Sequence, residues 1–158
     1  MPNYKAMIHW KRSGAKFLDH KYQRRHTWTF DSGLTMTAAA SPHIVGESYT
    51  DPSAIDPEEA FTASVASCHM LWFLSLAAGR GFVVNNYMDN SQGVLEKNSE
   101  GKLAMTKVII RPVVTFETER MPSQNDFLRL HRQAHSKCFI ANSIKSDIEI
   151  LPMMKSGG

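Results

Sequence analysis

Cysteine is scarce in this sequence, and the spacing of the two cysteines excludes several kinds of site. Only Cys68 and Cys138 occur among the 158 residues. They stand 70 positions apart, so they form neither a Cys-x-x-Cys redox motif nor a zinc knuckle. A cytoplasmic chain seldom uses two cysteines as a structural disulfide. Three interpretations stay open: two buried thiols, a redox pair, or one reactive thiol with a bystander.

Long apolar runs and tracts of one charge are also missing. The N-terminal residues lack the apolar segment of a secretory signal, and no continuous apolar run approaches the roughly 20 residues that cross a bilayer. We therefore expect a cytoplasmic protein without a membrane partner. The net charge is only +3, with no run of five or more basic residues, so nucleic acid is not an expected partner.

The pattern of apolar residues predicts an α+β fold in one domain, residues 1–158. Helices are expected over 57–78 and 123–137, and the predicted strands cover 4–10, 22–30, 34–40, 82–97, 103–118 and 144–151. The element order is then β-β-β-α-β-β-α-β. Residues 41–56 are expected to form a long loop, and the tail from Met153 to be flexible.

The helix over 57–78 has a clear beginning and an unusual surface. Asp56 and Glu59 have the spacing of a capping box, and Pro57 suits the first turn. Apolar residues occupy most of its circumference, which is typical of a central, buried helix. A chain of this length has little with which to cover such a helix on all sides. We therefore expect a dimer that packs the helix against its copy.

Cys68 lies in the middle of this helix, where a cysteine most often serves as a small hydrophobic residue. A position inside a helix does not favour the thiolate, because the dipole acts only near the terminal turns. A reactive Cys68 therefore needs a cation from elsewhere, and Arg24 and Arg25 are the concentrated basic source. Cys138 follows the second helix and is either a buried thiol or a resolving thiol.

Glu58 lies ten residues before Cys68, about 15 Å along a continuous helix. It is either a charge that suits the helix start or an acidic group that acts at the thiol. In the second case a kink or a partner subunit must bring the two together. His131 and His135 are four residues apart and could share a metal, but no third ligand is evident. We expect no metal site, and no nucleotide-binding loop suggests a bound cofactor.

Three segments together resemble the OsmC/Ohr family of organic-hydroperoxide-related proteins. The resemblance covers nearly the whole chain. The segments are DPEEAFTASVASCHM from Asp56, YQRRHTWTFDSG from Tyr22 and HSKCFIANSIKSDIEI from His135. The first carries a cysteine ten residues after the first glutamate, and the last carries the second cysteine. A histidine directly after the first cysteine, here His69, resembles the pattern of an OsmC-like branch of the family. Phe139 stands where the family usually has proline.

The resemblance implies an intertwined α+β homodimer with active sites at the subunit interface. It implies that Cys68 is the peroxidatic thiol and Cys138 the resolving thiol. Glu58 matches the acidic partner, and Arg24 is the best match for the arginine, with Arg25 second.

The implied function is a thiol-dependent peroxidase of oxidative stress defence, which reduces small apolar organic hydroperoxides to alcohols. An external dithiol or lipoyl-type reductant would regenerate it. Two other functions stay open: a non-catalytic dimer that binds an apolar small molecule, and a cysteine hydrolase with His69 or His26 as base.

Overall fold

The computed structural model describes residues 1–157 and divides the chain into two compact units. The first unit is Met1–Ala60, and the second begins at Phe61. Strands and helices stay segregated along the chain, so the predicted α+β class is confirmed. The expectation of a single domain stays a prediction, because contacts within one chain do not show whether each unit folds alone.

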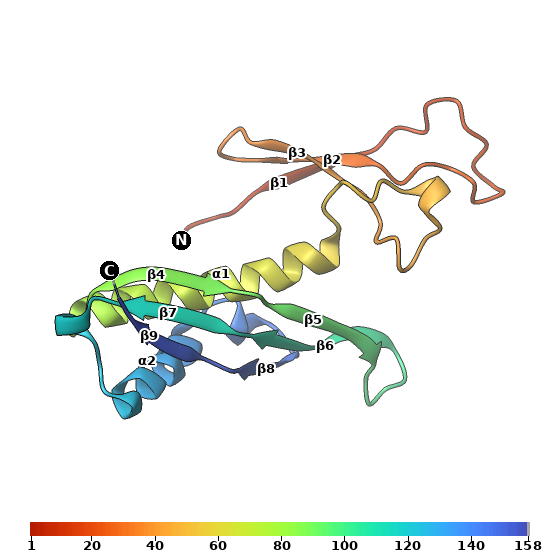
Figure 1. The fold of residues 1–158 in the computed structure, drawn as a ribbon. Helices are drawn as coiled ribbons and strands as arrows, with labels where there is room; N and C mark the ends of the chain where they lie inside the picture. Colours follow the sequence, from red (N-terminus) through yellow and green to blue (C-terminus); the bar gives the residue numbers. More distant parts are fainter. Residues whose placement is uncertain (158) are drawn as a thin grey trace. The chain divides into compact units, whose positions relative to one another are not determined.

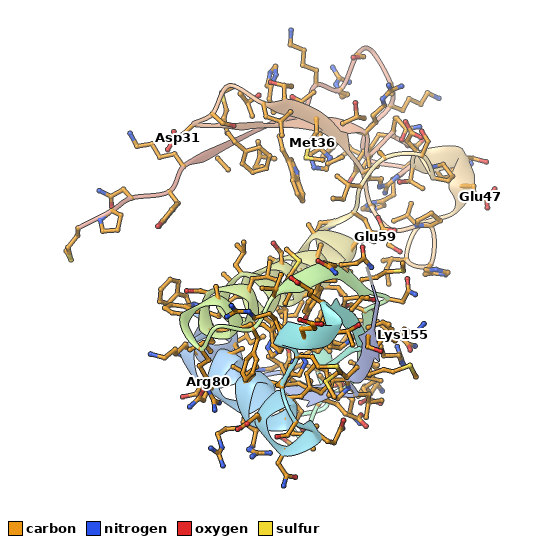
Figure 2. All side chains as sticks on the ribbon, turned by 60° about the vertical axis from the view of Figure 1, so that its left-hand side comes forward. Asp31, Met36, Glu47, Glu59, Arg80 and Lys155 are labelled. Atoms are coloured by element: carbon orange, nitrogen blue, oxygen red, sulfur yellow. The ribbon has the colours of Figure 1, made fainter. Side chains whose placement is uncertain are left out.

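The first unit is built on a small antiparallel sheet in the order β1-β2-β3. The strands are β1 (Ala6–His9), β2 (His26–Phe30) and β3 (Thr35–Ala38). Gly33, with a φ of 84°, lies in the hairpin turn between β2 and β3, the turn that contains Asp31, labelled in Figure 2. After β3 the chain is mostly irregular, as expected, apart from the short 3-10 helix η1 (Glu47–Tyr49).

The predicted strand over 22–30 is wrong in its first half. Tyr22 to Arg25 lie outside β2 because their backbone bonds go elsewhere than to a strand partner. The Arg24 N–H donates to the Tyr49 carbonyl at 2.9 Å and to the Gln23 side-chain oxygen at 3.0 Å. Such side-chain bonds to the local backbone compete with a sheet ladder.

Helix α1 (Pro57–Gly79) begins at the predicted capping box. The Glu59 N–H donates to Asp56 Oδ1 at 2.8 Å, and the Asp56 N–H donates to Glu59 Oε2 at 3.2 Å. The helix ends before Gly81, whose φ of 79° suits a residue without a side chain. α1 is therefore unbroken over its 23 residues.

The second unit contains two three-stranded sheets, β4-β7-β9 and β5-β6-β8. The strands are β4 (Val84–Asp89), β5 (Gln92–Lys97), β6 (Leu103–Ile110), β7 (Pro112–Phe116), β8 (Asp147–Ile150) and β9 (Met153–Ser156). Figure 1 shows β4 continuing into β5 and β6 continuing into β7.

The two long strands predicted over 82–97 and 103–118 are therefore wrong as single strands. The second breaks at Arg111, whose N–H donates to Asp89 Oδ1 at 2.7 Å instead of to a strand. Pro112 follows and has no N–H to offer to a ladder. The prediction of a flexible tail is also wrong, since β9 pairs in parallel with β7 from Val113 to Phe116.

Helix α2 (Gln124–Lys137) and α1 lie on one side of the strands of the second unit (Figure 1). The Ser123 hydroxyl caps α2 by accepting the Asp126 N–H. The main core joins both helices to β7 and consists of Phe73, Ala77, Val114, Phe116, Phe127, Leu130 and Ala134. A second cluster packs Val65 of α1 on Val108 and Ile110 of β6.

Within one chain, α1 buries one stripe and not its whole circumference. The buried residues are Val65, His69, Phe73 and Ala77, four apart along the helix. Leu71, which lies off this stripe, is 61% exposed. By length and composition alone α1 could also cross a membrane, but the core helix of a soluble protein passes the same test. The buried stripe indicates such a core helix.

Candidate thiol site

The second unit brings the two predicted cysteines together. Cys68 lies on α1 and is half-buried, whereas Cys138 is the C-cap residue of α2 and is only 1% exposed. Both are free thiols. The Cys68 side chain lies next to the Cys138 thiol and raises its pKa. Two thiols that are 70 residues apart in the sequence are thus neighbours in the fold.

The surroundings of Cys138 keep it protonated. Burial, followed by the hydrogen bond with Cys68, raises the pKa of the Cys138 thiol to about 11. Its Sγ accepts the Ala141 N–H at 3.4 Å, and its carbonyl accepts the Asn142 N–H at 3.0 Å. The turn after α2 therefore holds this thiol in place, facing α1.

Aromatic side chains flank the thiol pair. Trp72 lies one helical turn after Cys68, and its ring contacts the edge of Phe139 with centroids 5.5 Å apart. Phe139 follows Cys138 directly and is 67% exposed. The Lys137 ammonium lies 5.4 Å from the centre of the Trp72 ring. An apolar, partly accessible surface thus adjoins the site.

His69, the residue after Cys68, belongs to a buried pair of histidines that the sequence does not predict. His69 Nε2 lies 2.9 Å from His131 Nδ1, and the residues are 1% and 2% exposed. Burial, helped by the charge of His135, lowers the pKa of His69 to about 4. Burial, helped by His69, lowers the pKa of His131 to about 3. Both rings are therefore neutral at pH 7.

The pairing of His131 with His69 removes it from the metal site considered with His135. No group of three or more His, Cys, Asp or Glu side chains in residues 1–157 is arranged to hold a metal. Phe73 is fully buried and stacks on His131, with ring centroids 4.2 Å apart.

Arg24 belongs to the first unit, where an aromatic pocket of about 470 Å³ surrounds it. Its guanidinium lies 4.0 Å from the centre of the Tyr22 ring and donates to the carbonyls of His20 and Tyr22. Trp10 and Phe17 complete the aromatic wall. His20 adopts a left-handed φ of 61°, so a strained loop conformation accompanies this contact.

The other arginine and the acidic candidate have different surroundings. Arg25 is largely exposed and forms an ion pair with Asp51 at 3.4 Å. Glu58 lies in the first turn of α1 and is half-buried. Since α1 is unbroken, about 15 Å of helix separates Glu58 from Cys68 of the same chain. The two cannot touch within one chain.

His26 has a fixed tautomer, which argues against its use as a base. The Trp28 indole N–H can only donate, so His26 Nε2 accepts it at 2.9 Å. The His26 proton then resides on Nδ1 and is donated to the Arg24 carbonyl at 2.7 Å. Neither nitrogen is left for a substrate proton.

Comparison with known proteins identifies the family. The model of the OsmC-like protein family matches residues 50–151. An OsmC-like protein of unknown function from Vibrio cholerae is 43% identical, with a TM-score of 0.94 over 97% of this chain and 100% of that chain. The chain belongs to the OsmC-like family. No curated protein matches it.

More distant members show the same fold. An organic hydroperoxide resistance protein, OsmC, from Legionella pneumophila is 17% identical, with a TM-score of 0.65 over 98% of both chains. The organic hydroperoxide resistance protein OhrB of Bacillus subtilis is also 17% identical, with a TM-score of 0.63 over 97% of this chain and 98% of that one. The family and fold inferred from the sequence are thus confirmed.

Sequence reasoning missed the partner of each buried histidine and the aromatic pocket. His131 falls on the apolar face of α2 with Phe127 and Ala134, which was a usable signal of burial. No sequence signal connects it with His69, which lies 62 residues earlier. Trp10, Phe17 and Tyr22 are likewise spread over loops whose path the sequence does not fix.

Proposed function

We propose that this OsmC-like protein is a cysteine peroxidase that reduces organic hydroperoxides to alcohols in the cytoplasm. The single observation that carries the proposal is that the half-buried Cys68 and the buried Cys138 are neighbours in the fold. Family membership supports redox chemistry, because relatives are named as organic hydroperoxide resistance proteins. A core-filling role for both thiols does not require them to face each other.

The chemistry balances in three steps. The Cys68 thiolate attacks the terminal peroxide oxygen, the O–O bond breaks, and the alkoxide takes a proton and leaves as the alcohol. Cys68 is then a sulfenic acid. The Cys138 thiol attacks its sulfur, forming a disulfide and releasing water. An external dithiol, of the lipoyl type in our proposal, reduces the disulfide and is itself oxidised, so no bound cofactor is needed.

Arg24 and Glu58 are proposed to act on Cys68 of a partner subunit in a homodimer. The guanidinium would stabilise the thiolate, and the carboxylate would orient the guanidinium. Two observations support a dimer. About 15 Å of unbroken α1 separates Glu58 from Cys68 of the same chain, so Glu58 can act only on Cys68 of another chain. The apolar side chain of Leu71 on α1 is also exposed, and a partner subunit would cover it. The aromatic pocket around Arg24 suits an apolar hydroperoxide.

The test is turnover of cumene hydroperoxide and of hydrogen peroxide with a dithiol reductant. We expect faster turnover of the organic peroxide, and its loss in Cys68→Ser. In Cys138→Ser, one equivalent of peroxide should still oxidise Cys68, but no intramolecular disulfide should form. Equal, negligible rates in the wild type and Cys68→Ser would refute the peroxidase and favour the non-catalytic dimer that binds an apolar molecule.

Adjacent arginines provide a matched control for the thiolate partner. Arg24→Gln should lower turnover by at least tenfold if its charge stabilises the thiolate. Arg25→Gln should change turnover little, because Arg25 is largely exposed and paired with Asp51. The reverse order would transfer the role to Arg25.

Mixing inactive variants tests whether two subunits share a site. Cys68→Ser and Glu58→Gln are each expected to be inactive, but their heterodimer would contain one complete site. Random mixing should restore about a quarter of the wild-type rate, since half of the dimers are mixed and each holds one good site. No recovery despite proven subunit exchange would show that Glu58 does not act across the interface.

A further inference from the structure

The His69–His131 pair forms a polar link between α1 and α2 in the interior of the second unit. The hydrogen bond of 2.9 Å joins Nε2 of one ring to Nδ1 of the other. The rings are nearly parallel, with an angle of 3° between their planes. Phe73 stacks on His131 with ring centroids 4.2 Å apart, and Phe127 meets it edge-on at 4.7 Å. The pair is therefore closely packed.

Stability alone does not explain this pair. His69 Nδ1 and His131 Nε2 are buried and have no hydrogen-bond partner in the described part of the chain. One of them carries a proton and the other a lone pair, and both have lost their contact with water. Apolar side chains of similar volume would fill the same space without this cost. What a hydrogen bond adds is direction, because it joins two particular atoms at a defined distance and angle, whereas apolar attraction has no direction.

The histidine pair and the thiol pair join the same two helices, α1 and α2. His69 follows Cys68 immediately on α1. On α2, Cys138 comes seven residues after His131, about two helical turns further on the same face. A shift of α2 along α1 would therefore separate the thiols as it broke the histidine bond. Both contacts join the same two helices.

We propose that the His69–His131 hydrogen bond positions α2 on α1 so that the thiols of Cys68 and Cys138 meet. The pair does not touch the reacting atoms. It acts through the helices and sets the effective concentration of one thiol at the other. The inference shares the thiol pair with the proposed function, but it does not depend on peroxide as the substrate.

The atoms involved allow a crossed set of substitutions. The bond uses the outer nitrogen, Nε2, of His69 and the inner nitrogen, Nδ1, of His131. The terminal amide of glutamine reaches the position of Nε2, whereas that of asparagine reaches the position of Nδ1. His69→Gln and His131→Asn can therefore keep the bond. His69→Asn and His131→Gln place their amides at the wrong distance along the side chain.

The measurement is the equilibrium of the dithiol and disulfide forms in glutathione buffers without oxygen. Oxidised glutathione takes two electrons from Cys68 and Cys138, which form the disulfide, and two molecules of reduced glutathione are released. The equilibrium constant gives the effective concentration of the thiols. We expect the effective concentration in His69→Gln and in His131→Asn to stay within about threefold of the wild-type value. In the crossed variants, His69→Asn and His131→Gln, it should fall at least tenfold. Equal constants in all four variants would overturn the proposal.

A volume-matched apolar pair guards against variants that fail to fold. The double substitution His69→Leu and His131→Leu removes the unpaired nitrogens and should unfold at the wild-type temperature or above. Its effective concentration should nevertheless fall at least tenfold. A wild-type value in this variant would refute the positioning role even if the single variants are unstable.

The outcome is separable from that of the proposed function. The glutathione equilibrium requires neither a hydroperoxide nor the external dithiol reductant, and it does not depend on Arg24 or Glu58. Failure to turn over cumene hydroperoxide would remove the peroxidase but leave the crossed pattern intact. Equal effective concentrations in all four histidine variants, together with full peroxidase activity in the wild type, would refute the positioning role alone.

Discussion

Acidification from pH 7.5 to pH 5.0 tests the buried state of His69 and His131. The folded-state pKa values are about 4 and about 3, against 6.5 for an unperturbed histidine. Both folded values lie below the unfolded value, so the unfolded chain binds more protons as the pH falls. The stabilisation is complete above about pH 6.5 and is lost progressively from there to about pH 3.

The magnitude follows from the width of that window. At pH 5.0 an unfolded histidine is almost fully protonated, 1.5 pH units below its pKa, while both folded rings remain neutral. Each histidine should then lower the free energy of unfolding by roughly 2 kcal/mol, at 1.36 kcal/mol per unit. The pair together should lower it by roughly 4 kcal/mol, a large share of the stability of a small protein.

Urea denaturation at the two pH values measures this loss, and a double variant isolates its cause. His69→Gln with His131→Asn keeps a hydrogen bond but cannot titrate. The carboxylates contribute equally to both proteins, so their effect cancels in the difference. If the wild type loses less than about 1 kcal/mol more than the variant, the histidines are not buried as neutral rings and the reasoning is refuted.

Three further changes have defined outcomes. Asp56→Ala removes the cap of α1 and should cost about 1 kcal/mol in urea denaturation, whereas an unchanged value would mean that the cap is dispensable. Gly93→Ala would place a methyl group against the Thr62 hydroxyl and should destabilise the fold by about 1–3 kcal/mol; a rise in melting temperature would contradict this. Iodoacetamide should modify the half-buried Cys68 at least tenfold faster than Cys138, because Cys138 is buried and its pKa is raised to about 11. Mass spectrometry measures the two rates, and equal rates would contradict this prediction.

The local features of α1 could be predicted because they depend on neighbours in sequence. Asp56 and Glu59 cap the helix through bonds that span three residues. The apolar surface of the helix likewise indicated burial, which the structure shows for one stripe, whereas the dimer partner stays a prediction. The resemblance in the segments around Cys68 and Cys138 identified the family, which the comparisons confirm.

The strands were predicted less well because their partners are remote. Arg111 ends a strand by donating its N–H to Asp89, 22 residues away, and no local pattern encodes that bond. The segment from Met153 reads as a polar tail, yet it becomes β9 because β7 offers it an open edge. Each outcome depends on which segments meet after folding.

The α+β class, the family, the start of α1 and the residues capable of thiol chemistry can all be inferred from the amino-acid sequence. These follow from short-range bonds and from residue types that are visible along the chain. The proximity of Cys138 to Cys68 and the bond between His69 and His131 arise only when the chain folds. The reason is physical: α1 and α2 pack through one continuous core, and that packing selects which side chains come within bonding distance.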